Sequence, residues 1–176
     1  MIDRAALWIE PYWNAEHLRR TNDWLLTLEP DAVDALQLAA LTHDIERHFP
    51  GGPSLDLSLP PEEDTTYQKA HSERSARIVG AWLRDEGATP QTVEHVEHLI
   101  KLHETGGDGE ADLLQAADSI SFLEVNVDVP YRWADQGLCD LERASAQHRW
   151  MFERIRLPRA RELAQPYFEQ AVARGS

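Results

Sequence analysis

An adjacent imidazole and carboxylate, His43 and Asp44, stand at the end of a strongly apolar helical run. The run covers residues 32–41 and consists mostly of Ala, Leu and Val, which is typical of a core helix. Both polar groups are costly to bury unless they are hydrogen-bonded or bound to a cation. Two adjacent ligands cannot complete a metal site, so other parts of the chain must supply partners.

Other polar side chains share the apolar faces of separate predicted helices. At about 100° per residue, His17, His71 and Asp118 each align with the apolar residues of their own helix. Taken singly, each has a plain explanation, such as a hydrogen-bonded core histidine or an aspartate that caps a helix or pairs with an arginine. Their common inward direction is what points to shared chemistry.

The fourth predicted helix, residues 90–104, offers three histidines. His103 falls near the middle of the arc formed by its Val, Leu and Ile residues, whereas His95 lies on the flank and His98 points away. We therefore expect His103 to be buried and His98 to be a surface residue. Burying four imidazoles and two carboxylates from five helices without a cation would be expensive. Because this ligand set suits Fe, Mn, Zn, Co or Ni, the pattern predicts a metal site.

In chain order these side chains are His17, His43, Asp44, His71, His103 and Asp118. This order, over residues 13–125, resembles the HD superfamily of metal-dependent phosphohydrolases. The apolar helix before His-Asp-Ile, the His-Glu pair before a Gly-rich turn, and Ala-Asp-Ser at 117–119 support the resemblance. Residues 117–126 also look like uncharacterised bacterial HD-domain proteins.

The resemblance implies hydrolysis of a nucleotide or another small phosphate ester by a metal-activated water. The cofactor would be a divalent transition metal (Mn, Fe, Co, Ni or Zn), with one ion expected and a second left open. The residues implied to bind the first ion are His17, His43, Asp44 and Asp118. His71 and His103 occupy the places that hold a second ion or substrate in two-metal members, where Asp44 bridges.

Two departures from the family pattern bear on this interpretation. The family often reads His-Asp-Ile-Gly-Lys, whereas Glu46 and Arg47 stand in the last two places here. Arg47 keeps the positive charge and could bind phosphate bidentately. Glu46 has no counterpart and is interpreted as a solvent-facing residue. The His-His-Glu of two-metal members is Leu102-His103-Glu104 here, and the missing imidazole disfavours a second ion.

Catalytic roles are assigned to Asp44 as a metal ligand and to Glu104 or His71 as general base or acid. Three cations are candidates for binding the substrate phosphate: Arg47, Lys69 and Arg20. Arg47 is the first choice, because the other two are selected only for lying near an inward histidine. Each of the three could equally be an ordinary surface cation.

The same resemblance implies two alternatives to a hydrolase. Some HD-fold enzymes are di-iron oxygenases with this ligand set, and a bound iron pair would favour that chemistry. The other alternative is a non-catalytic HD domain used for binding, which the intact ligand set disfavours.

The helical periodicity and the lack of a convincing alternating strand predict an all-α fold, an HD-domain-like bundle of about seven helices. Residues 1–176 are expected to form one domain, with ligand-bearing helices over 13–125 and C-terminal helices over 126–173 packed on them. The predicted helices cover residues 13–28, 32–48, 62–86, 90–104, 110–124, 138–155 and 158–173. Residues 49–61 are rich in Pro and Gly and are predicted to be a loop that could border a pocket.

The C-terminal part contains a cluster of aromatic and arginine residues that includes Trp133 and Trp150. Such a stripe is interpreted as core or as a homodimer surface, although Arg149 or Arg154 could reach a phosphate from there.

The formal net charge of −14 argues against a nucleic acid or an anionic membrane as the main partner. It does not exclude a small phosphate-bearing substrate, because a bound cation can outweigh a diffuse acidic surface. A single cysteine, Cys139, cannot form an internal disulfide and suits a reducing cytosol. With no apolar signal region at the N-terminus, the expected location is the cytoplasm.

Overall fold

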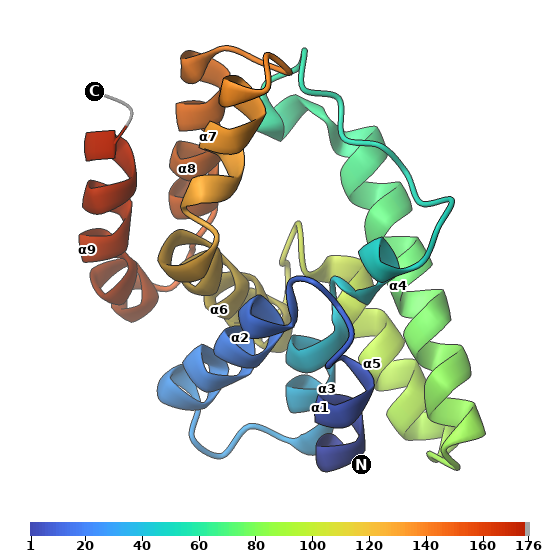
Figure 1. Ribbon diagram of the computed structural model, residues 1–176. Coiled ribbons are helices and arrows are strands. Elements are labelled where there is room, and N and C mark those ends of the chain that lie inside the picture. Colours follow the sequence, from blue (N-terminus) through green and yellow to red (C-terminus); the bar gives the residue numbers. More distant parts are fainter. Residues whose placement is uncertain (175–176) are drawn as a thin grey trace.

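The computed structural model describes residues 1–174, and within them the fold is all-α, as the sequence predicts (Figure 1). Nine α-helices and two short 3-10 helices make up this part of the chain, and it contains no strand. The α-helices are α1 (Ile2–Trp8), α2 (Ala15–Leu28), α3 (Asp34–Thr42), α4 (Thr65–Asp85), α5 (Pro90–Leu102), α6 (Gly109–Val125), α7 (Asp128–Asp135), α8 (Leu141–Glu153) and α9 (Pro158–Arg174). The 3-10 helices are η1 (Ile45–His48) and η2 (Pro61–Glu63).

The structure corrects the predicted helices in two places. The helix predicted over 32–48 ends at Thr42, and η1 follows after His43 and Asp44, so the two polar residues lie in a break. The sequence prediction also lacks α1 and α7, which explains why it counted about seven helices. Pro130 was interpreted as an interruption, but it lies in the first turn of α7, where its missing N–H needs no partner.

The central helices pack through a continuous apolar core. α2 lies against α3 and α6, α3 lies against α5, and α4 pairs with α5 along its length (Figure 1). Leu18, Leu25, Leu36, Leu99 and Leu114 are among its fully buried side chains. This packing brings the ends of α3 and α5 to the first turn of α2 and the middle of α6. The positions of the predicted ligands are therefore set by the rigid part of the fold.

A second apolar cluster joins the C-terminal helices to α6. α9 packs on α6 and α8 through Ile120, Met151, Ile155 and Ala164, all buried. This cluster places the last residues of α8 beside α6. None of the helices in residues 1–174 is long and apolar enough to cross a membrane.

Residues 49–60 form an extended loop that arches from η1 to the region of α8 (Figure 1). Two hydrogen bonds fix the loop. The N–H of Asp56 donates to Oδ2 of Asp64 (2.8 Å), and Nε of Arg143 donates to the carbonyl of Leu59 (2.6 Å). These hydrogen bonds hold the loop in place beside α4 and α8, which agrees with the expectation that it could border a pocket.

Candidate functional site

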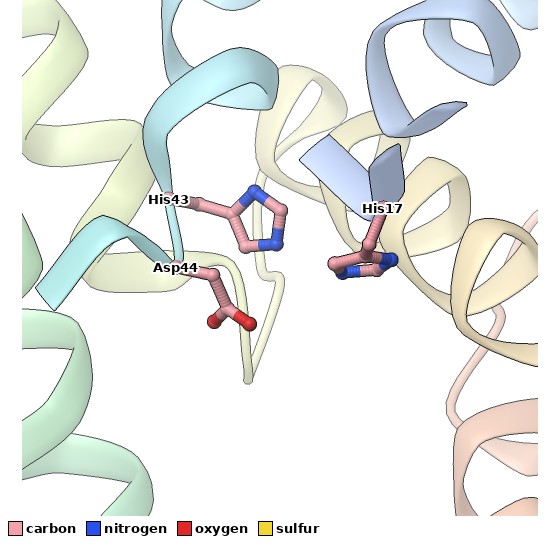
Figure 2. A group of neighbouring side chains, drawn as sticks. All are labelled: His17, His43 and Asp44. Carbon is pink, nitrogen blue, oxygen red and sulfur yellow. The ribbon is translucent and has the colours of Figure 1, made fainter. Parts of the chain in front are cut away.

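The six predicted ligands meet in the interior, and none of them is more than 5% exposed. They are His17 on α2, His43 and Asp44 after α3, His71 on α4, His103 after α5, and Asp118 on α6. Figure 2 shows that the side chains of His17, His43 and Asp44 point toward one another. The prediction that His103 is buried and His98 exposed is confirmed.

Two of the imidazoles are oriented by the ends of the helices that precede them. The last carbonyls of an α-helix lack partners within the helix. Nδ1–H of His43 donates to the carbonyl of Ala40 (3.0 Å), and Nδ1–H of His103 donates to that of Ile100 (2.7 Å). This fixes the tautomer and turns both Nε2 atoms inward, where they are buried without a hydrogen-bond partner.

The imidazoles of His17 and His71 are also hydrogen-bonded through Nδ1, but to side chains. The hydroxyl of Ser121 donates to the carbonyl of His17 (2.9 Å), so its oxygen accepts from Nδ1–H of His17 (2.9 Å). Nδ1–H of His71 donates to Oε1 of Glu46 (2.9 Å). All four histidines therefore use Nδ1 for an outer hydrogen bond and present Nε2 to the centre, the arrangement of metal-ligating histidines.

Each aspartate divides its two oxygens between an arginine and the imidazoles. Oδ2 of Asp44 pairs with Arg47 (2.7 Å), while Oδ1 lies 2.8 Å from Nε2 of His71. Oδ1 of Asp118 lies 3.0 Å from Nε2 of His17 and 3.4 Å from that of His43. When Nδ1 carries the proton, Nε2 has only a lone pair, so each of these contacts places a nitrogen acceptor against a carboxylate oxygen acceptor. A bound cation, or a second proton on the ring, is needed to make them favourable.

The directions of the pKa shifts of His43 and Asp44 also indicate that the centre favours positive charge. Burial lowers the pKa of His43, but the carboxylates of Asp118 and Asp44 bring it above its ordinary value. Burial raises the pKa of Asp44, but Arg47 and the neighbouring imidazoles bring it well below its usual range. The centre is therefore a buried site with ionised carboxylates that attract a cation.

Two groups of ligand atoms could each hold a metal ion, and both include Asp44. One group is His17, His43 and Asp44, and the other is Asp44, His71 and His103, with the ligand atoms of each within 4.8 Å of one another. Asp118 adjoins the first group through its contacts to His17 and His43. The imidazole and carboxylate donors fit a divalent transition metal, as the sequence predicts.

The interpretation of Glu46 as a solvent-facing residue is wrong. Its side chain is buried, with Oε1 accepting from His71 and Oε2 pairing with Arg74 (2.5 Å). Gly52 lies directly against this pair, since a Cβ there would come within 2.5 Å of Glu46 Oε2 and 2.7 Å of Arg74 Nη1. Glu46 therefore orients His71 from outside the ligand set, in a manner that family spacing alone did not indicate.

Arg154, at the end of α8, is tied to the site from the C-terminal part of the chain. Its guanidinium pairs with Glu104 and Asp118, and Nε donates to Ser119 Oγ (2.9 Å). Burial raises the pKa of Glu104, but Arg154 and His103 lower it to about 2. Because a carboxylate with such a pKa is a poor base near neutral pH, Glu104 suits electrostatic positioning better than proton abstraction.

The three candidate phosphate-binding cations have different locations. Arg47 lines the cavity beside Asp44. Lys69 is highly exposed and faces Glu73 (3.9 Å), while Arg20 pairs with Glu124 (2.9 Å) and Asp23. Neither Lys69 nor Arg20 lines the cavity that opens on the ligands, because their carboxylate partners hold them elsewhere.

A cavity of about 280 Å³ opens on the ligand set. Its lining combines His17, Asp44 and Asp118 with Tyr67 and with apolar residues from the loop, α6, α7 and α8. Tyr67 stacks on His71 (5.5 Å between ring centroids, 6° between planes), and burial raises the pKa of its phenol to about 12. Our sequence analysis missed Tyr67, although it precedes His71 by one helical turn and so shares its face.

The C-terminal tryptophans differ from their sequence interpretation. Trp133 and Trp150 line the cavity, although an aromatic stripe was expected to be core or dimer surface. Arg149 is exposed and outside this cavity.

Comparison with known proteins adds a family and a fold. A family model described as a domain of unknown function (DUF4202) matches residues 10–136. The solved structure titled "The crystal structure of Bacillus subtilis SeMet-YpgQ" is similar over 98% of this chain and 89% of that chain, with a TM-score of 0.66 and 18% sequence identity. At this identity the likeness shows a shared fold. No curated protein matches the sequence.

The Glu104–Arg154 pair should make stability depend on pH in the acid range. The pKa of Glu104 falls from 4.5 in an unfolded chain to about 2 in the fold. Its stabilising effect, on the order of 3 kcal/mol, is therefore complete above pH 4.5 and is lost as the pH falls through 2. Urea unfolding of metal-free wild type and Glu104→Gln should show a difference in the free energy of unfolding that shrinks over this range. A pH-independent difference would contradict the assignment.

Gly52→Ala should disturb the Glu46–Arg74 pair. The added Cβ displaces side chains that are held by several hydrogen bonds, so we expect a loss of about 1–3 kcal/mol in the free energy of unfolding. Gly109→Ala is the matched control, because no atom lies within 4 Å of a Cβ there and the backbone φ is not positive. Equal stability of the two variants in urea unfolding would show that the contact is dispensable.

Proposed function

The chain belongs to the DUF4202 family, and we propose that it is a metal-dependent phosphohydrolase acting on a small phosphate ester. One observation carries this proposal: four buried histidines present Nε2 to two aspartates at the base of a cavity, and two of these nitrogens have no hydrogen-bond partner. The order of these residues resembles that of the HD superfamily of phosphohydrolases. The resemblance supports hydrolysis over other chemistry of the same ligand set.

The first ion would be held by His17, His43, Asp44 and Asp118. When bound, a divalent metal lowers the pKa of a coordinated water and polarises a phosphoryl oxygen. A second ion would be held by His71 and His103, with Asp44 shared between the two groups.

The remaining cavity residues suit the binding of a phosphate group. Arg47 lines the cavity with its guanidinium partly exposed and can donate charge-assisted hydrogen bonds to phosphate oxygens. The phenol of Tyr67, with its pKa of about 12, stays protonated at neutral pH and can donate as well. Arg154 fixes Asp118 and Glu104 in their ionised forms. His71 does not line the cavity, so it suits the second ligand group better than the role of an acid or base that meets the substrate.

A di-iron oxygenase is the second candidate. The observation that favours it is the sharing of Asp44 by two potential metal groups, since oxygenases of this kind need two irons. Tightly bound iron with oxygen consumption, and without phosphate release, would decide for this alternative.

Asp44→Ala should abolish both metal binding and phosphate release. Wild type with Mn²⁺, Co²⁺ or Ni²⁺ should release phosphate from phosphomonoesters, and metal at about 100 times its Kd should stabilise the fold by about 2.7 kcal/mol. Asp44→Ala should lose the metal-dependent rise in Tm, because Asp44 belongs to both ligand groups. Asp23→Ala, which removes an exposed carboxylate paired with Arg20, is the control and should behave as wild type. Release of phosphate by Asp44→Ala at the wild-type rate would refute the proposal.

His103→Ala should change the number of ions bound. His103 is a member of the second ligand group only, so the variant should bind one ion per chain where the wild type binds up to two in excess Mn²⁺. His98→Ala is the matched control, because His98 lies on α5, the helix that His103 follows, but at the surface, and it belongs to neither ligand group. Metal content measured by elemental analysis that is equal in both variants would exclude the second site.

A further inference from the structure

The cavity above the candidate metal centre changes character along its walls. Its charged side chains gather where it meets the ligand set, around Asp44, Arg47 and Arg154. The side away from α3 and α5 is formed by the loop, α7 and α8 (Figure 1). These elements and the connection between α7 and α8 line the cavity with Leu55, Leu57, Val129, Trp133, Leu138 and Trp150.

The loop contributes its leucines in a regular manner. Residues 53–59 alternate between half-buried apolar side chains and exposed polar ones. Residues 56–59 form a turn in which the N–H of Leu59 donates to the carbonyl of Asp56 (3.2 Å). Asp56 and Ser58 form the outer face, and Asp56 accepts from both the N–H and the hydroxyl of Ser58 (2.9 and 2.6 Å). Leu55 and Leu57 turn toward the cavity. No neighbouring strand covers this apolar face in residues 1–174, so the cavity itself lies against it.

Two large apolar side chains of the cavity reach the protein surface. Trp13 is 63% exposed and Leu138 is 56% exposed, and both line the cavity. A single exposed apolar residue needs no explanation, but exposed apolar residues that continue into an apolar cavity favour an apolar ligand. The walls thus offer aromatic rings and leucines that remain partly in contact with solvent.

The charges available to a ligand are limited to one end. Among the described residues that line the cavity, the permanent cations are Arg47 and Arg154, and each is already paired with a site carboxylate. Asp64, the other charged residue of the lining, accepts backbone N–H groups from Asp56 and Tyr67. A chain of several phosphates lying within this cavity would meet no cation beyond these two among the described residues.

From this distribution we infer that the ligand is a phosphate monoester whose organic part is apolar and aromatic. The phosphate lies at the ligand set beside Arg47, and the ring system occupies the space between the leucines of the loop and Trp133 and Trp150. This inference rests on the proposed function for the position of the phosphate. It adds the organic part, which is recognised mainly by burial and by ring contacts. The amides of Asn14, Gln68, Asn126 and Gln147 also line the cavity and can add hydrogen bonds to it.

Binding of two unreactive phosphonates to the Mn²⁺-loaded protein tests the inference without relying on turnover. Isothermal titration calorimetry should give a Kd for 1-naphthylmethylphosphonate at least about 10-fold lower than that for methylphosphonate. Leu138→Ala should reduce this ratio several-fold, because it removes part of the apolar wall. Leu141→Ala is the matched control: Leu141 is also 56% exposed but does not line the cavity, so the ratio should stay unchanged.

Hydrolysis then separates the two proposals. Rates with 1-naphthyl phosphate and glycerol 2-phosphate should show a lower KM for the naphthyl ester in wild type and a smaller difference in Leu138→Ala. Equal affinity for the two phosphonates, or equal ratios in the two leucine variants, would overturn the inferred ligand class. If the naphthyl phosphonate is preferred but neither ester is hydrolysed, the ligand class stands and the proposed hydrolase function fails.

Discussion

The structure depends on the outer hydrogen bond that each of the four histidines of the candidate site makes through Nδ1. A neutral imidazole that donates from Nδ1 has only a lone pair at Nε2. All four Nε2 atoms face a space that also contains carboxylate oxygens of Asp44 and Asp118. Without positive charge at the centre, acceptors would oppose one another among side chains that are at most 5% exposed. The fold holds this arrangement through backbone carbonyls at two helix ends, through Ser121 and through Glu46.

The arginines around the centre complete this arrangement. Each of three arginines pairs with a carboxylate from outside the ligand set. Arg47 pairs with Asp44, Arg74 pairs with Glu46, and Arg154 pairs with both Asp118 and Glu104. These pairs keep the carboxylates ionised although burial alone would protonate them. Arg154 also links the C-terminal helices to the candidate site, because it follows α8 directly and pairs with Asp118 and Glu104. The second apolar cluster around α9 positions that arginine.

The sequence predicts well which histidines and aspartates lie in the interior, because most of them fall on an apolar stripe of their own helix. It predicts the helices less well where tertiary contacts decide the outcome. The break at His43 and Asp44 and the first-turn proline of α7 are examples. Glu46 could not be placed from the sequence, since a short 3-10 helix has no stripe long enough to show a direction. Arg154 and Trp150 were ambiguous, because the cavity they line is formed by segments far apart in the chain.

The most direct test of the central claim is a crystal of this protein soaked in Mn²⁺ and measured for anomalous scattering. The account predicts a strong anomalous peak enclosed by Nε2 of His17 and His43 and the inner oxygens of Asp44 and Asp118. A centre with no anomalous peak at saturating Mn²⁺, with Nε2 of His43 protonated and bonded to Asp118, would contradict it.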